Sequence, residues 1–310
     1  MTSRSQTVWD YEPLWAKAAL YMQRALEADR DSDLFPFWAS LALEHLGRAA
    51  LAKVHPALLA ATPNRDRSNL LYAFGHRPTA NPFVPRSIEA NEVFQRCEQV
   101  VPDFTQDIGR SCTGMAARRN EELHSGGLPF VDLPNQAWLP RFYEACKPLL
   151  SFQEKSMDEF FGAEEAKAAE TMLKSAADEA AKKVNGLIQE HAEAWAAKSE
   201  SDRITLSNEA DKAAQAHLGH VVDCPACGSK CLLTGEEIRQ QSPSLEDDLL
   251  VVRRIMLPTK FTCTACELEI VGHPALHAAN LGGQFTSTSY YDPLEYYLEG
   301  TEPQEEYDNE

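Results

Sequence analysis

Two cysteine pairs place the strongest constraint on how this chain folds. They are Cys224-Pro-Ala-Cys227 and Cys263-Thr-Ala-Cys266, and 35 residues separate them. A C-x-x-C turn presents two thiols on one tight knuckle, and four thiolates in a tetrahedron are the ligand set of a structural zinc ion. Gly228 follows the first pair, so the backbone can turn beneath a metal there. We therefore expect the two pairs to meet around one Zn2+ in a small module of their own.

The sequence leaves the fourth zinc ligand open. Cys231, His220 and His273 are alternatives, although Cys231 is more simply interpreted as a buried thiol. Three segments near the pairs have the pattern of strands: 249–256, 260–262 and 267–271. With two knuckles joined by a hairpin, the module resembles a zinc ribbon. Such modules are structural or recognise nucleic acid or protein, and four cysteines leave no open coordination position for catalysis.

Residues 10–152 are predicted to form a bundle of helices. Apolar residues recur at helical spacing in five segments: 11–28, 35–59, 87–100, 105–124 and 135–151. Pro140 and Pro148 are expected to interrupt the last helix. Residues 60–86 are rich in Pro, Asn and Arg and are expected to form a long loop, and such loops are often functional. Cys97, Cys112 and Cys146 are expected to be buried among the helices.

The composition changes twice after the bundle. Residues 153–218 are rich in Ala, Glu and Lys, which predicts a long helical spacer. Residues 219–291 contain the zinc-ribbon-like module, and residues 292–310 form an acidic tail without a basic residue. The expected fold class is therefore mainly α: an N-terminal helical bundle, a long Ala/Glu-rich helix and a small β-rich module.

The net charge of −18 is unevenly distributed. Residues 1–150 contain 16 Lys and Arg against 17 Asp and Glu, whereas residues 151–310 contain 13 against 30. In the first half 13 of the 16 cations are arginine, the side chain suited to bidentate phosphate contact, although ordinary solubility explains them equally well. The acidity therefore does not exclude an anionic partner for the first half. Because no apolar run approaches the roughly 18 residues of a membrane helix, we expect a cytoplasmic protein without a membrane segment.

A second motif, Arg119-Asn120-x-x-x-His124, closes the helix predicted over residues 105–124. An Arg five residues before a His is common by chance in a chain with 9 His and 17 Arg. The requirement for Asn directly after that Arg is far more selective, and only His124 meets it. The motif supplies a cation, an amide and an imidazole, which when unperturbed titrates near 6.5 and suits proton transfer at neutral pH. The alternative interpretation is a surface ion-pair cluster of Arg119, Glu122 and His124 at a helix end.

This motif, near the end of a late helix in an all-helical domain, resembles the HEPN superfamily of ribonucleases. The resemblance covers about residues 10–150 and implies a homodimer that brings two motifs to one cleft. It also implies metal-independent cleavage of RNA, in which the 2′-hydroxyl attacks the adjacent phosphate. His124 would then be the general acid and base, Arg119 would stabilise the phosphorane charge, and Asn120 would orient groups or contact the phosphate. Many members are toxins or act in phage defence and cleave tRNA or other cellular RNA.

Further residues are candidates for binding the substrate. Glu44 lies in the second helix, where members of the family often hold a polar residue, and it is expected on the polar face of that helix. Arg65, Arg67 and Arg77 lie in the long loop, and Arg118 precedes the motif. The competing hypothesis is a non-catalytic dimer that binds a regulatory protein or a nucleic acid through its zinc ribbon or acidic tail.

Overall fold

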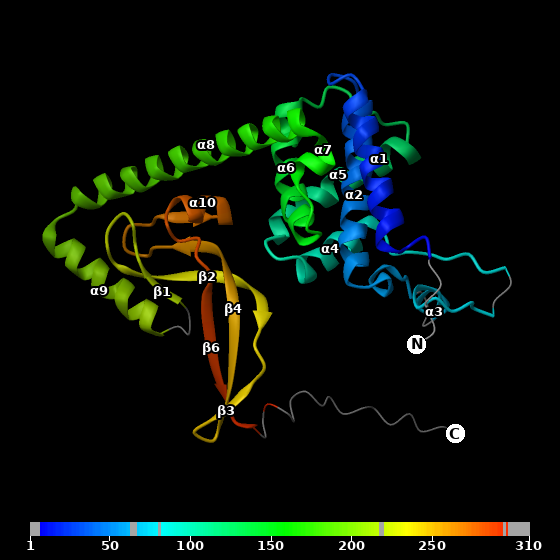
Figure 1. The fold of residues 1–310 in the computed structure, drawn as a ribbon. Coiled ribbons are helices and arrows are strands. Elements are labelled where there is room, and N and C mark those ends of the chain that lie inside the picture. Colours follow the sequence, from blue (N-terminus) through cyan, green and yellow to red (C-terminus); the bar gives the residue numbers. More distant parts are fainter. Residues whose placement is uncertain (1–6, 63–66, 80–81, 217–219, 294–295, 297–310) are drawn as a thin grey trace. The chain divides into compact units, whose positions relative to one another are not determined.

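The computed structural model describes residues 7–62, 67–79, 82–216, 220–293 and 296. The chain is mainly α with a small antiparallel sheet, which confirms the predicted fold class at this level. It divides into a helical unit, residues 1–176, and a sheet unit, residues 177–310, and Figure 1 shows the elements of each. The division falls inside one helix, α8, and not at either end of the predicted spacer. Within the described part of the chain, no helix has the length and apolarity needed to cross a membrane.

The helical unit is built around α2, whose apolar residues occur on all sides, as expected for a central helix. In chain order the unit contains α1 (Tyr11–Glu27), α2 (Leu34–Val54), η1 (Pro56–Leu59), α3 (Ser68–Ala73), α4 (Ala90–Val100), α5 (Gln106–His124), α6 (Asn135–Phe152), α7 (Met157–Phe161) and the first part of α8 (Ala163–Ala196). Helix α2 contacts α1, α4, α5 and α6. Helix α3 lies within residues 60–86, the segment that was predicted to be a loop.

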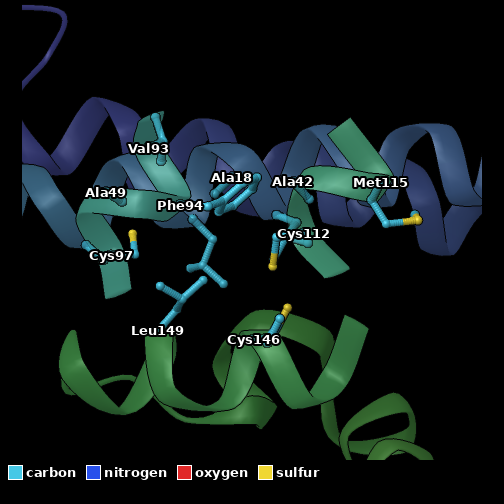
Figure 2. Packing of buried hydrophobic residues seen from close by; sticks show 14 of the residues in the cluster. Ala18, Ala42, Ala49, Val93, Phe94, Cys97, Cys112, Met115, Cys146 and Leu149 are labelled. Atoms are coloured by element: carbon cyan, nitrogen blue, oxygen red, sulfur yellow. The ribbon is translucent and has the colours of Figure 1, made fainter. Parts of the chain in front are cut away.

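The core of the helical unit lies between α2, α4, α5 and α6. Phe94 of α4, Cys112 of α5 and Cys146 and Leu149 of α6 point into the same interior (Figure 2), and each is at most 1% exposed. Cys97 is also fully buried, so the prediction of three buried thiols is confirmed. Burial raises the pKa of the Cys112 and Cys146 thiols far above the ordinary value, which keeps them protonated and unreactive.

Helix α6 does not break at its prolines, contrary to the expectation. It continues through Pro140 and Pro148, although each proline removes one backbone hydrogen bond. Trp138, Phe142 and Leu149 of the same helix are all buried in the core. Tertiary packing of these large side chains therefore overrides the local cost of the prolines.

The N-terminal turn of α8 is fixed to the helical unit by Glu165. Its carboxylate pairs with Arg30 and accepts a hydrogen bond from the buried hydroxyl of Tyr143. Farther along α8, Val184 belongs to the core of the sheet unit together with Ala210 of α9 (Glu200–Ala216). The predicted spacer is thus not a separate body, because its two parts pack into different cores.

The sheet unit is organised by β4 (Leu249–Thr262), which pairs antiparallel with four other strands. The remaining elements are β1 (His220–Asp223), β2 (Lys230–Gln240), β3 (Ser244–Glu246), β5 (Glu269–Val271), α10 (His273–Ala278) and β6 (Phe285–Tyr291). Strand β4 is continuous, whereas the sequence predicted two strands separated at Pro258. Pro258 lies opposite Gly235 at a shift in register, where the ladder tolerates the missing N–H.

Candidate functional site

Arg119 lies on the face of α5 that packs into the helical core. Cys112 and Met115 are buried on this face, and Arg119 follows Met115 by four residues. The Arg119 side chain is only 11% exposed, and its Nη1 lies 2.6 Å from Oε2 of Glu44 on α2. Glu44 is 6% exposed and therefore buried, which corrects the expectation that it lies on a polar face. The structure thus joins the first residue of the motif to the second helix by an ion pair.

Arg48 holds Glu44 from the other side. Its Nε and Nη2 donate to Oε1 of Glu44 at 2.8 and 2.7 Å. The same guanidinium donates to Oγ of Ser87 at 3.0 Å and to the carbonyl of Ile88 at 2.8 Å, just before α4. Arg48 was not among the predicted site residues, although its four-residue spacing from Glu44 is the signal of a helical ion pair.

The two arginines keep Glu44 ionised. Burial disfavours the charged carboxylate, but the attraction of Arg48 and Arg119 and the hydrogen bonds from Arg48 outweigh this effect and hold the pKa of Glu44 below its ordinary value. The carboxylate is therefore negative at neutral pH and fixes both guanidinium groups in place.

Three buried polar atoms around this pair lack hydrogen bonds to the described residues. They are Oε2 of Glu44, Nε of Arg119 and Oε2 of Glu122. The first lies within ion-pair distance of Arg119 but does not accept an aligned hydrogen bond. A buried polar atom without a partner costs about 1–3 kcal/mol, so these atoms reduce the stability of the helical unit.

Asn120 and His124 are exposed and lie on one face of α5, because four residues separate them. The helix ends at Ser125, whose N–H and hydroxyl both donate to the carbonyl of Glu121, at 2.9 and 2.8 Å. Arg119 is about 140° around the helix from His124. Among the described residues, no hydrogen bond or ion pair joins the side chain of Arg119 to that of Asn120 or His124. In one copy of the chain, Arg119 therefore points into the helical unit, whereas Asn120 and His124 are exposed on its surface.

His45, the neighbour of Glu44, is held neutral at pH 7. Burial lowers the pKa of His45 to about 4, against the opposing effects of its hydrogen bond to Leu41 and the charge of Glu44. Its Nδ1 lies 2.9 Å from the Leu41 carbonyl, and the edge of its ring meets Tyr21 at 5.1 Å. In the neutral ring Nδ1 donates to that carbonyl, which leaves Nε2 as an acceptor.

The predicted substrate-binding arginines are dispersed. Arg118 is exposed and its Nη1 donates to the carbonyl of Pro129 at 3.1 Å. Arg67 and Arg77 are exposed at the start of α3 and in the segment after it. Arg65 lies outside the described residues. Of the candidates that the structure describes, Glu44 is the one that forms an ion pair with a residue of the motif.

The four predicted zinc ligands converge in the sheet unit. The sulfur atoms of Cys224, Cys227, Cys263 and Cys266 all lie within 4.8 Å of one another, and they can hold a metal ion such as zinc. The Cys224–Cys266 and Cys227–Cys263 sulfur distances are both 3.6 Å. A tetrahedral zinc with Zn–S bonds of about 2.3 Å places its sulfurs roughly 3.8 Å apart. The cluster therefore has the size that a tetrathiolate site requires.

The two knuckles have the same backbone geometry. In the first, N–H of Cys224 donates to the Ser229 carbonyl at 2.9 Å, and Gly228 has φ of 76°. In the second, N–H of Cys263 donates to the Leu268 carbonyl at 2.9 Å, and the residue with positive φ, at 63°, is Glu267. Each hairpin thus requires a left-handed residue immediately after its second cysteine, and only the first supplies glycine.

The three alternative ligands lie in the sheet unit. Cys231 donates from its thiol to the Ser229 carbonyl at 3.3 Å, and His220 stacks on the ring of Phe285 with centroids 4.5 Å apart. His273 begins α10. Among the described residues, none of the three belongs to the group of four clustered cysteines.

Comparisons with known proteins give no match: neither a protein-family model, nor a curated protein, nor a solved structure matches this chain.

Proposed function

We propose that this protein is an endoribonuclease that acts as a homodimer and cleaves RNA without a catalytic metal. The proposal extends to a toxin or phage-defence effector that cleaves cellular RNA such as tRNA, as the resemblance to the HEPN superfamily implies. Arg119, Asn120 and His124 would form the catalytic group.

The observation that carries the proposal is the ion pair between Arg119 and the buried Glu44. A surface ion-pair cluster at a helix end would not need a carboxylate buried in another helix, nor a second arginine to hold it. Glu44 and Arg48 are positioning residues in this proposal.

The proposed reaction needs one base and one acid. A neutral His124 takes the proton of the 2′-hydroxyl as O2′ attacks phosphorus, and the P–O5′ bond breaks as a protonated imidazole donates to O5′. His124 of the partner subunit is the group suited to the second role, because each chain supplies only one such imidazole. Arg119 stabilises the charge on the phosphoryl oxygens, and Asn120, on the same helix face as His124, contacts the phosphate. The products are a 2′,3′-cyclic phosphate and a 5′-hydroxyl.

We further propose that the four clustered cysteines hold a structural Zn2+ in a zinc-ribbon-like module. The metal would cross-link two hairpins, the knuckle between β1 and β2 and the knuckle between β4 and β5. The cysteines occupy all four positions of a tetrahedral ion, so this site is assigned to folding and partner recognition.

Cleavage of labelled RNA tests the proposed activity. The wild-type protein, His124→Ala and the matched control His277→Ala, another exposed histidine, are assayed with and without EDTA, and their oligomeric state is measured by sedimentation. We expect cleavage by a wild-type dimer and by the control, in the presence of chelator, and a loss of about 100-fold or more in His124→Ala. Equal cleavage by the wild type and His124→Ala, or none by either, would rule the proposal out.

A second candidate is a non-catalytic dimer that binds a protein partner through the sheet unit. This candidate is favoured because three cations on the sheet pair with carboxylates of the same unit and are therefore not available to phosphates. Arg253 pairs with Glu246 at 2.8 Å, Arg254 with Glu237 at 3.1 Å and Lys260 with Glu269 at 3.0 Å. This candidate predicts no RNA cleavage and a complex with a protein that is lost in Cys224→Ser.

A further inference from the structure

Helix α3 presents a cation, an aliphatic and an aromatic side chain on one exposed face. Arg67, Leu71 and Phe74 are spaced by four and three residues, so they share that face. Leu71 is 46% exposed and Phe74 is 47% exposed. The ring of Phe74 is backed by the imidazole of His55, with centroids 4.9 Å apart and planes tilted by 44°.

The opposite face of α3 is fixed to the helical unit. Asn69 is 3% exposed, its Nδ2 donates to the carbonyl of Ala61 at 2.8 Å, and its Oδ1 accepts from the N–H of Arg86 at 2.8 Å. Tyr72 meets Trp9 edge-on at 5.0 Å. Asn69 thus connects α3 to the backbone on both sides of it, at Ala61 and at Arg86. These contacts fix the orientation of the exposed face without a bound partner.

The surroundings of this face are basic in a strongly acidic chain. Residues 67–79 and 82–88 contain Arg67, Arg77 and Arg86 and no acidic residue, whereas the net charge of the chain is −18. All three arginines are exposed. Among the described residues none of them forms an ion pair, in contrast to the paired cations of the sheet unit. An exposed aromatic ring, with unpaired arginines before and after it in the sequence, is complementary to an unpaired nucleotide.

We propose that this surface, which we name the α3 platform (His55, Arg67, Leu71, Phe74 and Arg77), binds unpaired RNA. A nucleobase stacks on Phe74, and Arg67 and Arg77 contact the flanking phosphates. The choice of RNA as the occupant rests on the proposed ribonuclease function. Paired bases do not offer their faces for stacking, so the platform selects single-stranded segments and tolerates different sequences.

Binding of a short fluorescent oligouridine, measured by anisotropy in a His124→Ala background, tests the platform. Phe74→Ala should weaken binding by at least about fivefold, which is 1 kcal/mol at 1.4 kcal/mol per tenfold, and Phe74→Trp should restore it. Arg77→Glu should weaken binding most at low salt. Leu20→Ala, on an exposed apolar side chain of α1, and Arg110→Glu, on an exposed arginine of α5, are matched controls that should bind as the parent does.

The inference is overturned if a folded Phe74→Ala variant binds oligouridine within twofold of its parent, or if polyglutamate competes as well as the oligonucleotide. The second result would assign the platform to an acidic protein. Binding that depends on Phe74, in a protein whose wild type does not cleave RNA, would support the platform and reject the proposed function. If Phe74→Ala changes neither RNA cleavage nor oligouridine binding, the α3 platform is rejected and the proposed ribonuclease function is retained.

Discussion

At Glu44, two arginines from different helices meet one buried carboxylate. The sequence predicted only part of this arrangement. The four-residue spacing to Arg48 was visible, but the contact with Arg119 joins positions 75 residues apart and depends on how α2 and α5 pack. Burial of Glu44 could not be predicted either, because a carboxylate is rarely buried unless it is paired. The motif itself was readable because its residues are neighbours in the sequence.

Removal of the Glu44 charge should destabilise the helical unit. In Glu44→Gln the guanidinium groups of Arg48 and Arg119, both 11% exposed, lose their counter-charge, and we expect a loss of about 3 kcal/mol in the free energy of unfolding. Urea unfolding measures this loss. Glu92→Gln is the control, because Glu92 pairs with Arg96 on the surface of α4 and should change stability by less than about 0.5 kcal/mol. Similar small effects of the two substitutions would contradict a buried ion pair.

His45 should make the protein less stable as the pH falls. Its pKa is about 4 in the folded chain and 6.5 in the unfolded reference, so the unfolded state binds the proton first. The contribution of His45 to the free energy of unfolding is complete above pH 6.5 and is lost as the pH falls towards 4. The loss is roughly 3 kcal/mol, at 1.36 kcal/mol per pKa unit. Unfolding of the wild type and His45→Gln at a series of pH values measures it. The difference between the two should shrink over this range; a difference that does not change with pH would show that His45 titrates normally.

At the scale of elements, the helices and the knuckles followed from local patterns. The helix of residues 106–124 and the C-x-x-C hairpins were anticipated from spacing alone. The prolines led to two wrong predictions, a break in α6 and a break in β4. Core packing compensates for the prolines of α6, and a register shift opposite Gly235 accommodates the proline of β4. Strand β6 and helix α10 were missed because a Ser/Thr-rich strand and a six-residue helix lack a clear periodicity.

The matching knuckles predict opposite effects of two glycine substitutions. Glu267→Gly should stabilise the sheet unit by up to about 1 kcal/mol, because a left-handed conformation costs a residue with a side chain roughly 1–2 kcal/mol and the glycine gives part of this back as chain entropy. Gly228→Ala should destabilise it by about 1 kcal/mol, although nothing lies within 4 Å of the added Cβ. Thermal unfolding of the zinc-loaded variants gives both values. Destabilisation by Glu267→Gly would contradict the shared geometry.

At the scale of the whole molecule, the described residues form two cores, and the four clustered cysteines belong to the core of the sheet unit. The sequence predicted a helical domain and a zinc-ribbon-like module joined by a helical spacer. The position of their division inside α8 depends on which residues of one uniform Ala-rich helix pack on each core, and composition does not carry that information.

Removal of the metal should therefore unfold only the sheet unit. A zinc chelator is expected to expose Cys224, Cys227, Cys263 and Cys266 to alkylation, because metal binding and folding of such modules are coupled. Three further cysteines, at 97, 112 and 146, should stay protected in the helical core. Mass spectrometry of the alkylated protein measures both groups. Equal reactivity of all of them after chelation would show that the two cores unfold together.

The chemistry of the RNA ends tests the central claim most directly. RNA is incubated with the wild type and with His124→Ala, and in parallel a 2′-O-methyl RNA of the same sequence is incubated with the wild type. We expect 2′,3′-cyclic phosphate and 5′-hydroxyl ends from unmodified RNA with the wild type only. Cleavage of the 2′-O-methyl RNA, or the same ends produced by His124→Ala, would contradict it.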